Sequence, residues 1–271
     1  MKAPTIITLT TDFGLRDGNV GVMKGVIWGI APGVHIVDIS HAVSPQNIFE
    51  GAFILGRSAS YFPAGTVHVA VVDPGVGTTR RPLTASLGGQ FFVGPDNGLC
   101  TILLQHAERE GQPVEMVHLD QPKYWLPEVS NVFHGRDIFS PVAAHLANGL
   151  ALHELGTPLT DPVRLELPEP KCTSQGWVGQ VIYIDHFGNV ISNITRHHLE
   201  GQTISRVRLG GIEIQGMVRT FGDRPPGEVI SLFGSTGNLI VSVVNGNASD
   251  TLGVSLHDPV EVLLKIPPHL R

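Results

Sequence analysis

Regular alternation between two kinds of segment in the first 150 residues most limits the folds open to this chain. Short runs rich in β-branched residues end at a polar residue or a glycine, and segments of helical length separate them. The runs are 5–14, 34–40, 66–75, 90–98 and 114–120, and the helical segments are 19–32, 45–63, 97–110 and 135–149. Buried strands that alternate with amphipathic helices indicate an α/β layer with a largely parallel sheet.

The pattern changes near residue 164. The segment 164–176 combines proline with mixed charge and shows no periodicity, which is typical of a linker. Beyond it, helical segments are replaced by β-branched runs that end in glycine and asparagine turns. We therefore predict an α/β domain over 1–163, a linker over 164–176, and a small all-β, barrel-like domain over 177–271.

Composition excludes several classes of protein. Only 15% of the 271 residues are charged, the net charge is −6, and no block of Lys or Arg suggests a nucleic-acid partner. Cys100 and Cys172 form neither a CxxC motif nor a disulfide framework, which is typical of reduced thiols in the cytoplasm. The N-terminus lacks the apolar core of a signal peptide, and no uncharged apolar run approaches the ~18 residues that span a bilayer. We expect a soluble cytoplasmic protein.

Four acids follow predicted strands directly: Asp12, Asp38, Asp73 and Asp96, each near Gly, Pro or Ser. Ligands of open α/β sheets bind outside the carboxyl ends of the strands, so these acids mark the place for a site. The HExxH, HxH and CxxC metal motifs, the phosphate-binding P-loop and the GxSxG nucleophile elbow are all absent from the sequence. We therefore expect neither a metal nor a cofactor, and we interpret Cys100 as a buried structural thiol.

Two stretches place an acid at such a strand end. In TTDFGLRDG, an acid at the strand end can accept hydrogen bonds from both hydroxyls of a ribose. Alternatively, Asp12 or Asp17 merely caps the next helix. In VVDPGVGTTRR, Asp73 is followed by a proline, two glycines and paired arginines. The second stretch is either a polar turn with solvated arginines or a loop that brings an acid and a cation around a ligand.

Two further stretches have a structural and a functional interpretation. In NVFHGRDIFSP, His134 stands between an aromatic residue and a glycine, where a lone histidine is usually structural. In IDHFGNVISNI, Asp185, Phe187 and Asn189 alternate, so they share one face of a strand if no bulge intervenes. That face has the groups to hold an amine and an adenine ring, although a structural cross-strand cluster would have the same pattern.

Together, and in this order, six segments resemble one family. TTDFGLRDG, PGVHIVDISHAVSP, VVDPGVGTTRR, GPDNGL, FHGRDIFSP and IDHFGNVISNI are similar to the S-adenosylmethionine hydroxide adenosyltransferases, relatives of the fluorinase and chlorinase enzymes. The resemblance runs from about residue 5 to residue 265. It implies that water and S-adenosylmethionine give adenosine and methionine. It also implies an α/β domain followed by a β-barrel, in a homotrimer whose active sites lie between the first domain of one subunit and the second domain of its neighbour.

The resemblance also implies roles for residues of this sequence. The water-activating set of the family, an Asp, an Arg seven residues later and a distant His, matches Asp73, Arg80 and His134, with Arg81 as the adjacent alternative. Whether Asp73 or His134 takes the proton stays open at this point. The substrate-binding positions implied by similarity are Asp12 for the ribose, Asp17 near the nucleoside, Asp185 and Ser235 at the amino-acid end, Asn189 and Phe221 at the adenine, and Phe187, which either joins them or only packs.

The halogenating relatives differ at these positions. By resemblance they have an aromatic residue where this chain has Asp73, a serine where it has Gly135, and an insertion that is missing here between about residues 80 and 95. All three differences favour water over halide as the nucleophile. Gln46 replaces the aromatic residue that stacks near the ribose. A non-catalytic binder of the nucleoside and a halide-dependent transferase remain the alternatives.

Overall fold

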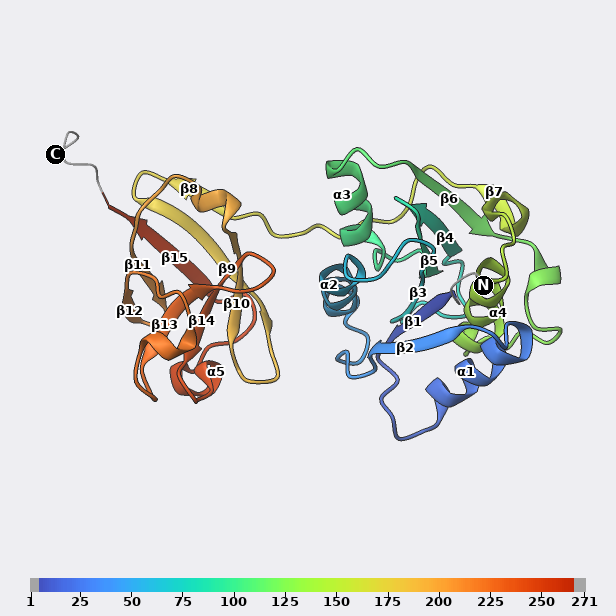
Figure 1. Ribbon diagram of the computed structural model, residues 1–271, viewed down its shortest axis with the longest axis horizontal. Coiled ribbons are helices and arrows are strands. Elements are labelled where there is room, and N and C mark those ends of the chain that lie inside the picture. The colour runs from blue at the N-terminus through green and yellow to red at the C-terminus, as the bar shows by residue number, and fades with distance from the viewer. Residues whose placement is uncertain (1–4, 266–271) are drawn as a thin grey trace. The chain divides into compact units, whose positions relative to one another are not determined.

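The computed structural model describes residues 5–265 and divides into two compact units between Leu165 and Glu166. The first unit is built on a seven-stranded sheet (Figure 1), with strand order β2-β1-β3-β5-β4-β6-β7. Its strands are β1 (Ile6–Thr11), β2 (His35–Ser40), β3 (Val67–Val71), β4 (Pro82–Leu87), β5 (Gln90–Pro95), β6 (Val114–Leu119) and β7 (Gly156–Pro158).

The sheet of the first unit is mixed. Strands β1, β2, β3 and β5 are parallel to one another, whereas β4, β6 and β7 pair antiparallel. Sequence patterns did not reveal β4, which forms a hairpin with β5 across Gly88 and Gly89. Both glycines have positive φ angles, +55° and +91°, which suit a tight two-residue turn. The predicted α/β class is confirmed, and the antiparallel strands lie along one side of the parallel part.

Helices cover both faces of this sheet. They are α1 (Asn19–Ile30), α2 (Ile48–Ala59), α3 (Thr101–Arg109) and α4 (Ser140–Ala147), with a π-helical turn, η2 (Gly135–Phe139), leading into α4 and short 3₁₀ turns η1 (Pro122–Tyr124) and η3 (Leu152–Leu155). Helices α1 and α4 share one buried cluster with the sheet, and α2 and α3 share the other. The unit is therefore a three-layer sandwich whose loops at the carboxyl ends of the parallel strands are free to form a site.

The second unit is an antiparallel sheet that is nearly closed. Its strands are β8 (Lys171–Thr173), β9 (Gly176–Ile184), β10 (Val190–Thr195), β11 (Ile204–Leu209), β12 (Ile212–Gln215), β13 (Val229–Phe233), β14 (Asn238–Val243) and β15 (Pro259–Leu264). The order is β12-β11-β15-β9-β10-β14-β13, with β8 on β9. Just past β12, the N–H of Val218 donates to the carbonyl of Ser231 in β13 at 2.9 Å, which joins the two ends of the sheet. The barrel-like prediction is confirmed.

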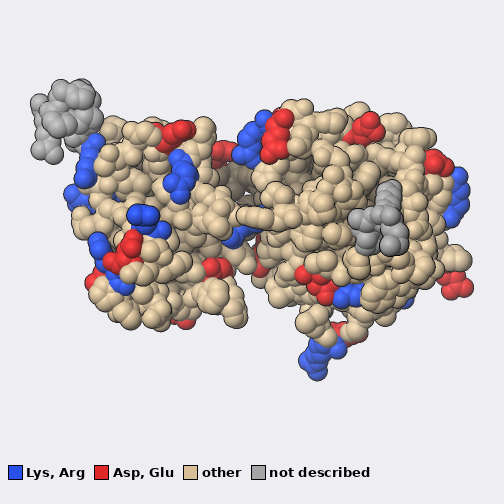
Figure 2. Space-filling model, viewed as in Figure 1, with Lys and Arg blue, Asp and Glu red and all other residues tan. Residues whose placement is uncertain are grey.

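The second unit carries little helix: α5 (Ala248–Leu252) and the 3₁₀ turns η4 (His197–Leu199) and η5 (Phe221–Asp223). Strand β8 lies inside the segment 164–176 that we expected to be a linker, because Lys171–Thr173 pair with β9. None of the helices within residues 5–265 is long and apolar enough to cross a bilayer. On the face shown in Figure 2, Lys and Arg lie among acidic residues and form no continuous basic stripe.

Candidate active site

A cavity of about 360 Å³ opens at the carboxyl ends of β1 and β3 in the first unit. Three of the residues predicted for the site, Asp12, Asp73 and His134, line it. Its remaining lining residues are Phe13, Pro45, Gln46, Val71, Pro74, Val76, Val132, Phe133 and Gly135. The cavity is thus formed where the loop after β1, the loop before α2, the loop after β3 and the segment before η2 meet, in agreement with the strand-end rule.

Asp73 and Arg80 form a buried, two-pronged ion pair beside this cavity. Arg80 Nε donates to Asp73 Oδ1 at 3.1 Å, and Arg80 Nη2 donates to Asp73 Oδ2 at 2.5 Å. The side chains of Arg80 and Asp73 are only 6% and 5% exposed. Burial raises the pKa of the Asp73 carboxyl, and the charges of Arg80 and His134 only partly oppose this. The acid and the cation of VVDPGVGTTRR are therefore partners and not the solvated ends of a polar turn.

His134 joins the same network from a distant segment. Arg80 Nη2 also donates to Nδ1 of His134 at 2.9 Å, so one guanidinium nitrogen bridges the acid and the imidazole. Burial and the Arg80 charge lower the pKa of His134, while Asp73, Asp137 and the backbone of Ser130 act in the opposite direction. His134 is consequently neutral at physiological pH, which is the form that accepts a hydrogen bond at Nδ1.

Tight backbone contact brings the two loops of this network together. Gly77 has a φ of +77°, and a Cβ atom at this position would collide with the backbone carbonyl of Asn131. Within the same loop, the hydroxyl of Thr78 donates to the carbonyl of Gly75 at 2.7 Å and accepts from the N–H of Arg80 at 3.3 Å. The glycine permits close approach and the threonine shapes the turn, so that Arg80 points back to Asp73.

Asp137 supports the segment that carries His134. Its side chain is completely buried, its Oδ2 accepts from the N–H of Ser130 at 2.8 Å, and its carbonyl accepts from the N–H of Leu126 at 2.9 Å. Arg136 pairs with the same carboxylate. Sequence patterns did not single out Asp137 as part of the site. The available signal was the adjacent pair Arg136–Asp137 directly before an apolar segment, since a buried carboxylate implies a specific partner.

Asp12 is held at the wall of the cavity. The N–H of Gln46, a residue with a φ of +65°, donates to Asp12 Oδ2 at 2.8 Å, which orients the carboxylate. Neither predicted acid caps the next helix, because Gly18 is the N-cap residue of α1 and no side chain bonds there. Asp17 is exposed in the loop before α1 and does not line the cavity.

The other two strand-end acids serve the structure. Asp38 lies within β2 and not at its end as predicted; it accepts from Nζ of Lys24 at 2.6 Å and lies 3.1 Å from Nε2 of His41. Asp96, after β5, accepts from Nε of Arg81 at 2.8 Å. Arg81 is thus directed away from Asp73, whereas its neighbour Arg80 pairs with that acid. Of the row of four acids, two reach the cavity.

In the second unit, the predicted strand face around Asp185 is wrong. Residues 185–189 form the turn between β9 and β10, in which Asp185 Oδ1 accepts from the N–H of Phe187 and from the N–H of Asn189, both at 2.9 Å. Asn189 Nδ2 also donates to Asp185 Oδ2 at 2.8 Å. Gly188 has a φ of +78°, so the chain reverses where we expected an extended segment. The side chain of Phe187 is 72% exposed.

The remaining predicted residues lie at different ends of this unit. Ser235 is exposed in the turn between β13 and β14, beside the end of β10, whereas Asp185 precedes the start of β10. Phe221 begins η5 in the loop that leads to β13, and it is 44% exposed. Since Val229 pairs with Val243, that loop approaches the end of the barrel that bears the Asp185 turn. The unit does not gather all five residues into one cluster.

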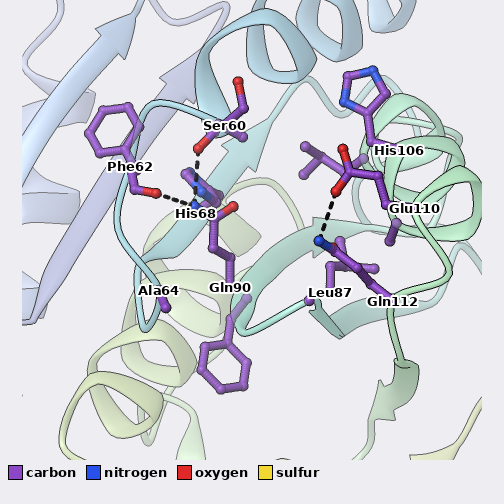
Figure 3. A pocket seen from close by; sticks show the side chains of 14 residues that line it. Ser60, Phe62, Ala64, His68, Leu87, Gln90, His106, Glu110 and Gln112 are labelled. Carbon is purple, nitrogen blue, oxygen red and sulfur yellow. Dashed lines mark hydrogen bonds between the residues drawn. The ribbon is translucent and has the colours of Figure 1, made fainter.

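A second cavity, of about 400 Å³, lies at the opposite end of the strands of the first sheet, near the β4–β5 hairpin and the starts of β3 and β5 (Figure 3). Its polar groups are largely committed to internal bonds. Gln90 Nε2 donates to the carbonyls of Ala59 and Phe62 at 3.0 and 2.7 Å, and Nδ1 of His68 bonds to Thr8 at 2.8 Å. Burial lowers the pKa of His68 to about 4. This cavity lacks the acid–guanidinium–imidazole set of the first, which remains the candidate active site.

Family models match both halves of the chain. SAM hydroxide adenosyltransferase N-terminal domain matches residues 7–156, and the C-terminal domain of the same family matches residues 179–261. The chain belongs to the SAM hydroxide adenosyltransferase family. The resemblance inferred from six short segments is confirmed.

Known proteins agree with this assignment. The chain is 42% identical, over 96% of its length and 98% of the relative, to the (R)-S-adenosyl-L-methionine hydrolase of Salinispora tropica. It is 31% identical to the fluorinase of Actinoplanes sp., over 76% of this chain and 79% of that one. A crystal structure of an uncharacterized conserved protein from Thermotoga maritima matches with a TM-score of 0.86 and 36% identity, and covers 95% of this chain and 99% of its own.

Within residues 5–265, no group of three or more His, Cys, Asp or Glu side chains is arranged to hold a metal ion. The expectation that the reaction of this family member uses no metal or cofactor stays a prediction. The two cysteines are free; Cys100 is buried near the start of α3, where burial raises the pKa of its thiol, and Cys172 is exposed. This agrees with the structural interpretation of Cys100.

Proposed function

We propose that this enzyme hydrolyses S-adenosyl-L-methionine to adenosine and L-methionine by attack of water at the 5′-carbon of the ribose. The observation that carries the proposal is the buried network in which Arg80 bridges Asp73 and His134 at the wall of a cavity that Asp12 also lines. Relatives named S-adenosyl-L-methionine hydrolases match nearly the whole chain, whereas the fluorinases match less of it.

The chemistry of the reaction suits these residue types. Displacement at the 5′-carbon expels a neutral thioether from a sulfonium ion, so the leaving group requires no proton. The demanding partner is water, whose pKa of about 15.7 makes it a weak nucleophile until a base takes a proton as attack proceeds. Asp73 and His134 line the cavity where that water would lie, and Arg80 fixes both from one side. Alignment of oxygen, carbon and sulfur contributes to the rate through positioning.

We propose the (R) configuration at sulfur for the substrate. The relative from Salinispora tropica is named for that epimer. The sulfonium sulfur has three different substituents and a lone pair, so it is a stereocentre. The two epimers exchange the methyl group and the lone pair, so a pocket with room for the methyl group on one side only binds one epimer.

Roles for the binding residues follow from the family resemblance and from position. We assign Asp12, oriented by the N–H of Gln46, to the ribose hydroxyls. The exposed rings of Phe187 and Phe221 suit the adenine, and Asn189 its polar edge. The amino-acid end is assigned to Asp185 and Ser235, and Asp17 to the vicinity of the nucleoside. Asp185 already accepts three hydrogen bonds within its turn, so any contact with the substrate amine uses a remaining lone pair.

We further propose a homotrimer in which the second unit of a neighbouring subunit completes each site. The support is the family resemblance, together with the position of the residues assigned to the adenine and to the amino-acid end, which belong to a unit other than the one that holds Asp73. Light scattering on the purified protein measures the assembly, and a monomer with full activity contradicts the proposal.

The function is tested with purified protein and each epimer of S-adenosylmethionine. Chromatography should show equimolar adenosine and methionine from the (R) epimer, with far slower turnover of the (S) epimer. Equal turnover of both epimers contradicts the epimer assignment. Tight adenosine binding without turnover identifies a non-catalytic binder, and chloride-dependent formation of a 5′-chloro nucleoside identifies a halide-dependent transferase. Either result overturns the proposed function.

A further inference from the structure

The hydrogen bonds of Arg80 determine which nitrogen of His134 carries hydrogen. Arginine donates and never accepts, so the 2.9 Å contact from Arg80 Nη2 to His134 Nδ1 requires a lone pair on Nδ1. A neutral imidazole has one such lone pair, and its other nitrogen bears a hydrogen. Nε2 of His134 is therefore the protonated nitrogen, and the backbone carbonyl of Ser130 interacts with the ring as an acceptor.

In this arrangement, neither ring nitrogen of His134 is free to take another proton. Nε2 already carries hydrogen, and protonation of Nδ1 would break the bond to Arg80. It would also place a positively charged ring against a buried guanidinium, and two like charges at hydrogen-bond distance in a poorly solvated site repel strongly. Asp73 and Asp137 favour the charged form of His134, but burial and Arg80 outweigh them.

Asp73 keeps room for a proton in the same network. Its oxygens accept from Nε and Nη2 of Arg80, and the backbone of Gly75 contributes one further hydrogen bond. A carboxylate offers about four lone-pair positions, so one remains for a proton. Asp73 also lines the cavity, whereas Arg80 does not and lies behind it, with its guanidinium 5.5 Å from the ring centroid of Phe139. The free position of the carboxylate is thus the one that a water in the cavity can reach.

We propose that Asp73 accepts the proton of the attacking water, and that His134 is a positioning residue that holds Arg80 and, through Arg80, Asp73. The proposal rests on the proposed hydrolysis. The water oxygen forms a bond to the 5′-carbon while the bond from that carbon to sulfur breaks. The electron pair of the broken bond stays on sulfur, which becomes a neutral thioether. One water proton passes to Asp73 and leaves to solvent after the products depart.

Two substitutions of His134 separate accepting a hydrogen bond from accepting a proton. In His134→Asn, the side-chain oxygen occupies the place of Nδ1 and can accept from Arg80, but an amide does not take a proton at neutral pH. His134→Ala removes the acceptor. We expect kcat for His134→Asn within about tenfold of wild type, and kcat for His134→Ala and Asp73→Asn lower by about 10²-fold or more. KM should change little in Asp73→Asn, and circular dichroism checks that each variant is folded.

If His134→Asn is as slow as His134→Ala, or if Asp73→Asn keeps the wild-type rate, the assignment is overturned. A measurement independent of turnover is the ring ¹⁵N spectrum of histidine-labelled wild-type protein, with His134→Asn as the reference for the signal of that residue. We expect a neutral ring at pH 7 with hydrogen on Nε2, and a signal from the Nδ1–H form contradicts the inference. Wild-type protein that forms no adenosine refutes the proposed function instead, and the spectrum still reports on the network.

Discussion

Removal of the Arg80 charge tests whether the ion pair is as deeply buried as the structure shows. In Arg80→Met, a side chain of similar length without charge leaves Asp73 in a position where it is 5% exposed. The carboxylate loses two hydrogen bonds and its counter-ion. Breaking a buried pair by removing one partner is expected to lower the free energy of unfolding by about 3–5 kcal/mol near neutral pH.

The loss should depend on pH with a defined sign. Without Arg80, the folded-state pKa of Asp73 rises further above its unfolded value, because burial is no longer opposed by the guanidinium. A raised folded-state pKa for an acid means that stability is gained as pH falls, so the difference from wild type should shrink toward pH 5. Adding Asp73→Asn to Arg80→Met, which removes the unpaired charge, should recover a large part of the stability at neutral pH.

Urea unfolding followed by circular dichroism at pH 7.5 and pH 5, on wild type and on the single and double variants, measures these differences. The matched control is Arg81→Met, which breaks the separate pair with Asp96 and should leave catalysis largely intact while it also lowers stability. An Arg80→Met protein within about 0.5 kcal/mol of wild type at both pH values refutes the reasoning, since that is the range of ordinary surface substitutions.

Three further results are expected. Gly77→Ala should lower the free energy of unfolding by about 1–3 kcal/mol and reduce kcat, because the new Cβ would meet the carbonyl of Asn131 at a φ of +77°; thermal unfolding and steady-state kinetics measure both. The rate should fall as pH drops through the acidic range, because protonated Asp73 takes no proton and protonated His134 accepts nothing from Arg80; a rate that rises toward acid contradicts this. Asp12→Ala should raise KM for the substrate more than it lowers kcat, and an unchanged KM rejects the ribose contact.

Sequence patterns revealed the class of each half of the chain because both patterns are local. Alternating strands and helices in the first half, and β-runs with glycine turns in the second, depend on neighbouring residues only. The Gly88–Gly89 turn gives a local signal of the same kind, because two glycines separate two apolar runs. The short strand before this turn follows a loop and was not recognised. The mixed character of the sheet follows from that hairpin.

The site was less accessible to sequence reasoning because its contacts are long-range. Spacing favoured Arg80 over Arg81, and the structure shows the physical reason. Adjacent residues in an extended chain point in opposite directions, and the side chain of Arg81 bonds to Asp96. The contact from Arg80 to His134 joins residues 54 positions apart. No pattern in either segment encodes it.

The Asp185 segment shows the opposite case, a local signal that was misinterpreted. Asp, a glycine two residues before the next strand, and Asn are turn-forming residues, and in this chain they form the β9–β10 turn. Alternation over five residues is too short a pattern to establish a strand against such residues. A segment that contains both signals is better assigned to the turn.

The paired carboxylate has a consequence for the choice of nucleophile. Arg80 is a buried cation, and a buried cation without a counter-ion attracts any small anion that can reach it. Asp73 occupies that place with a covalently attached charge, so chloride and similar ions meet a carboxylate where they would otherwise find a guanidinium. Uncharged water meets no such repulsion. We therefore expect the Asp73–Arg80 pair to disfavour halides relative to water as the nucleophile.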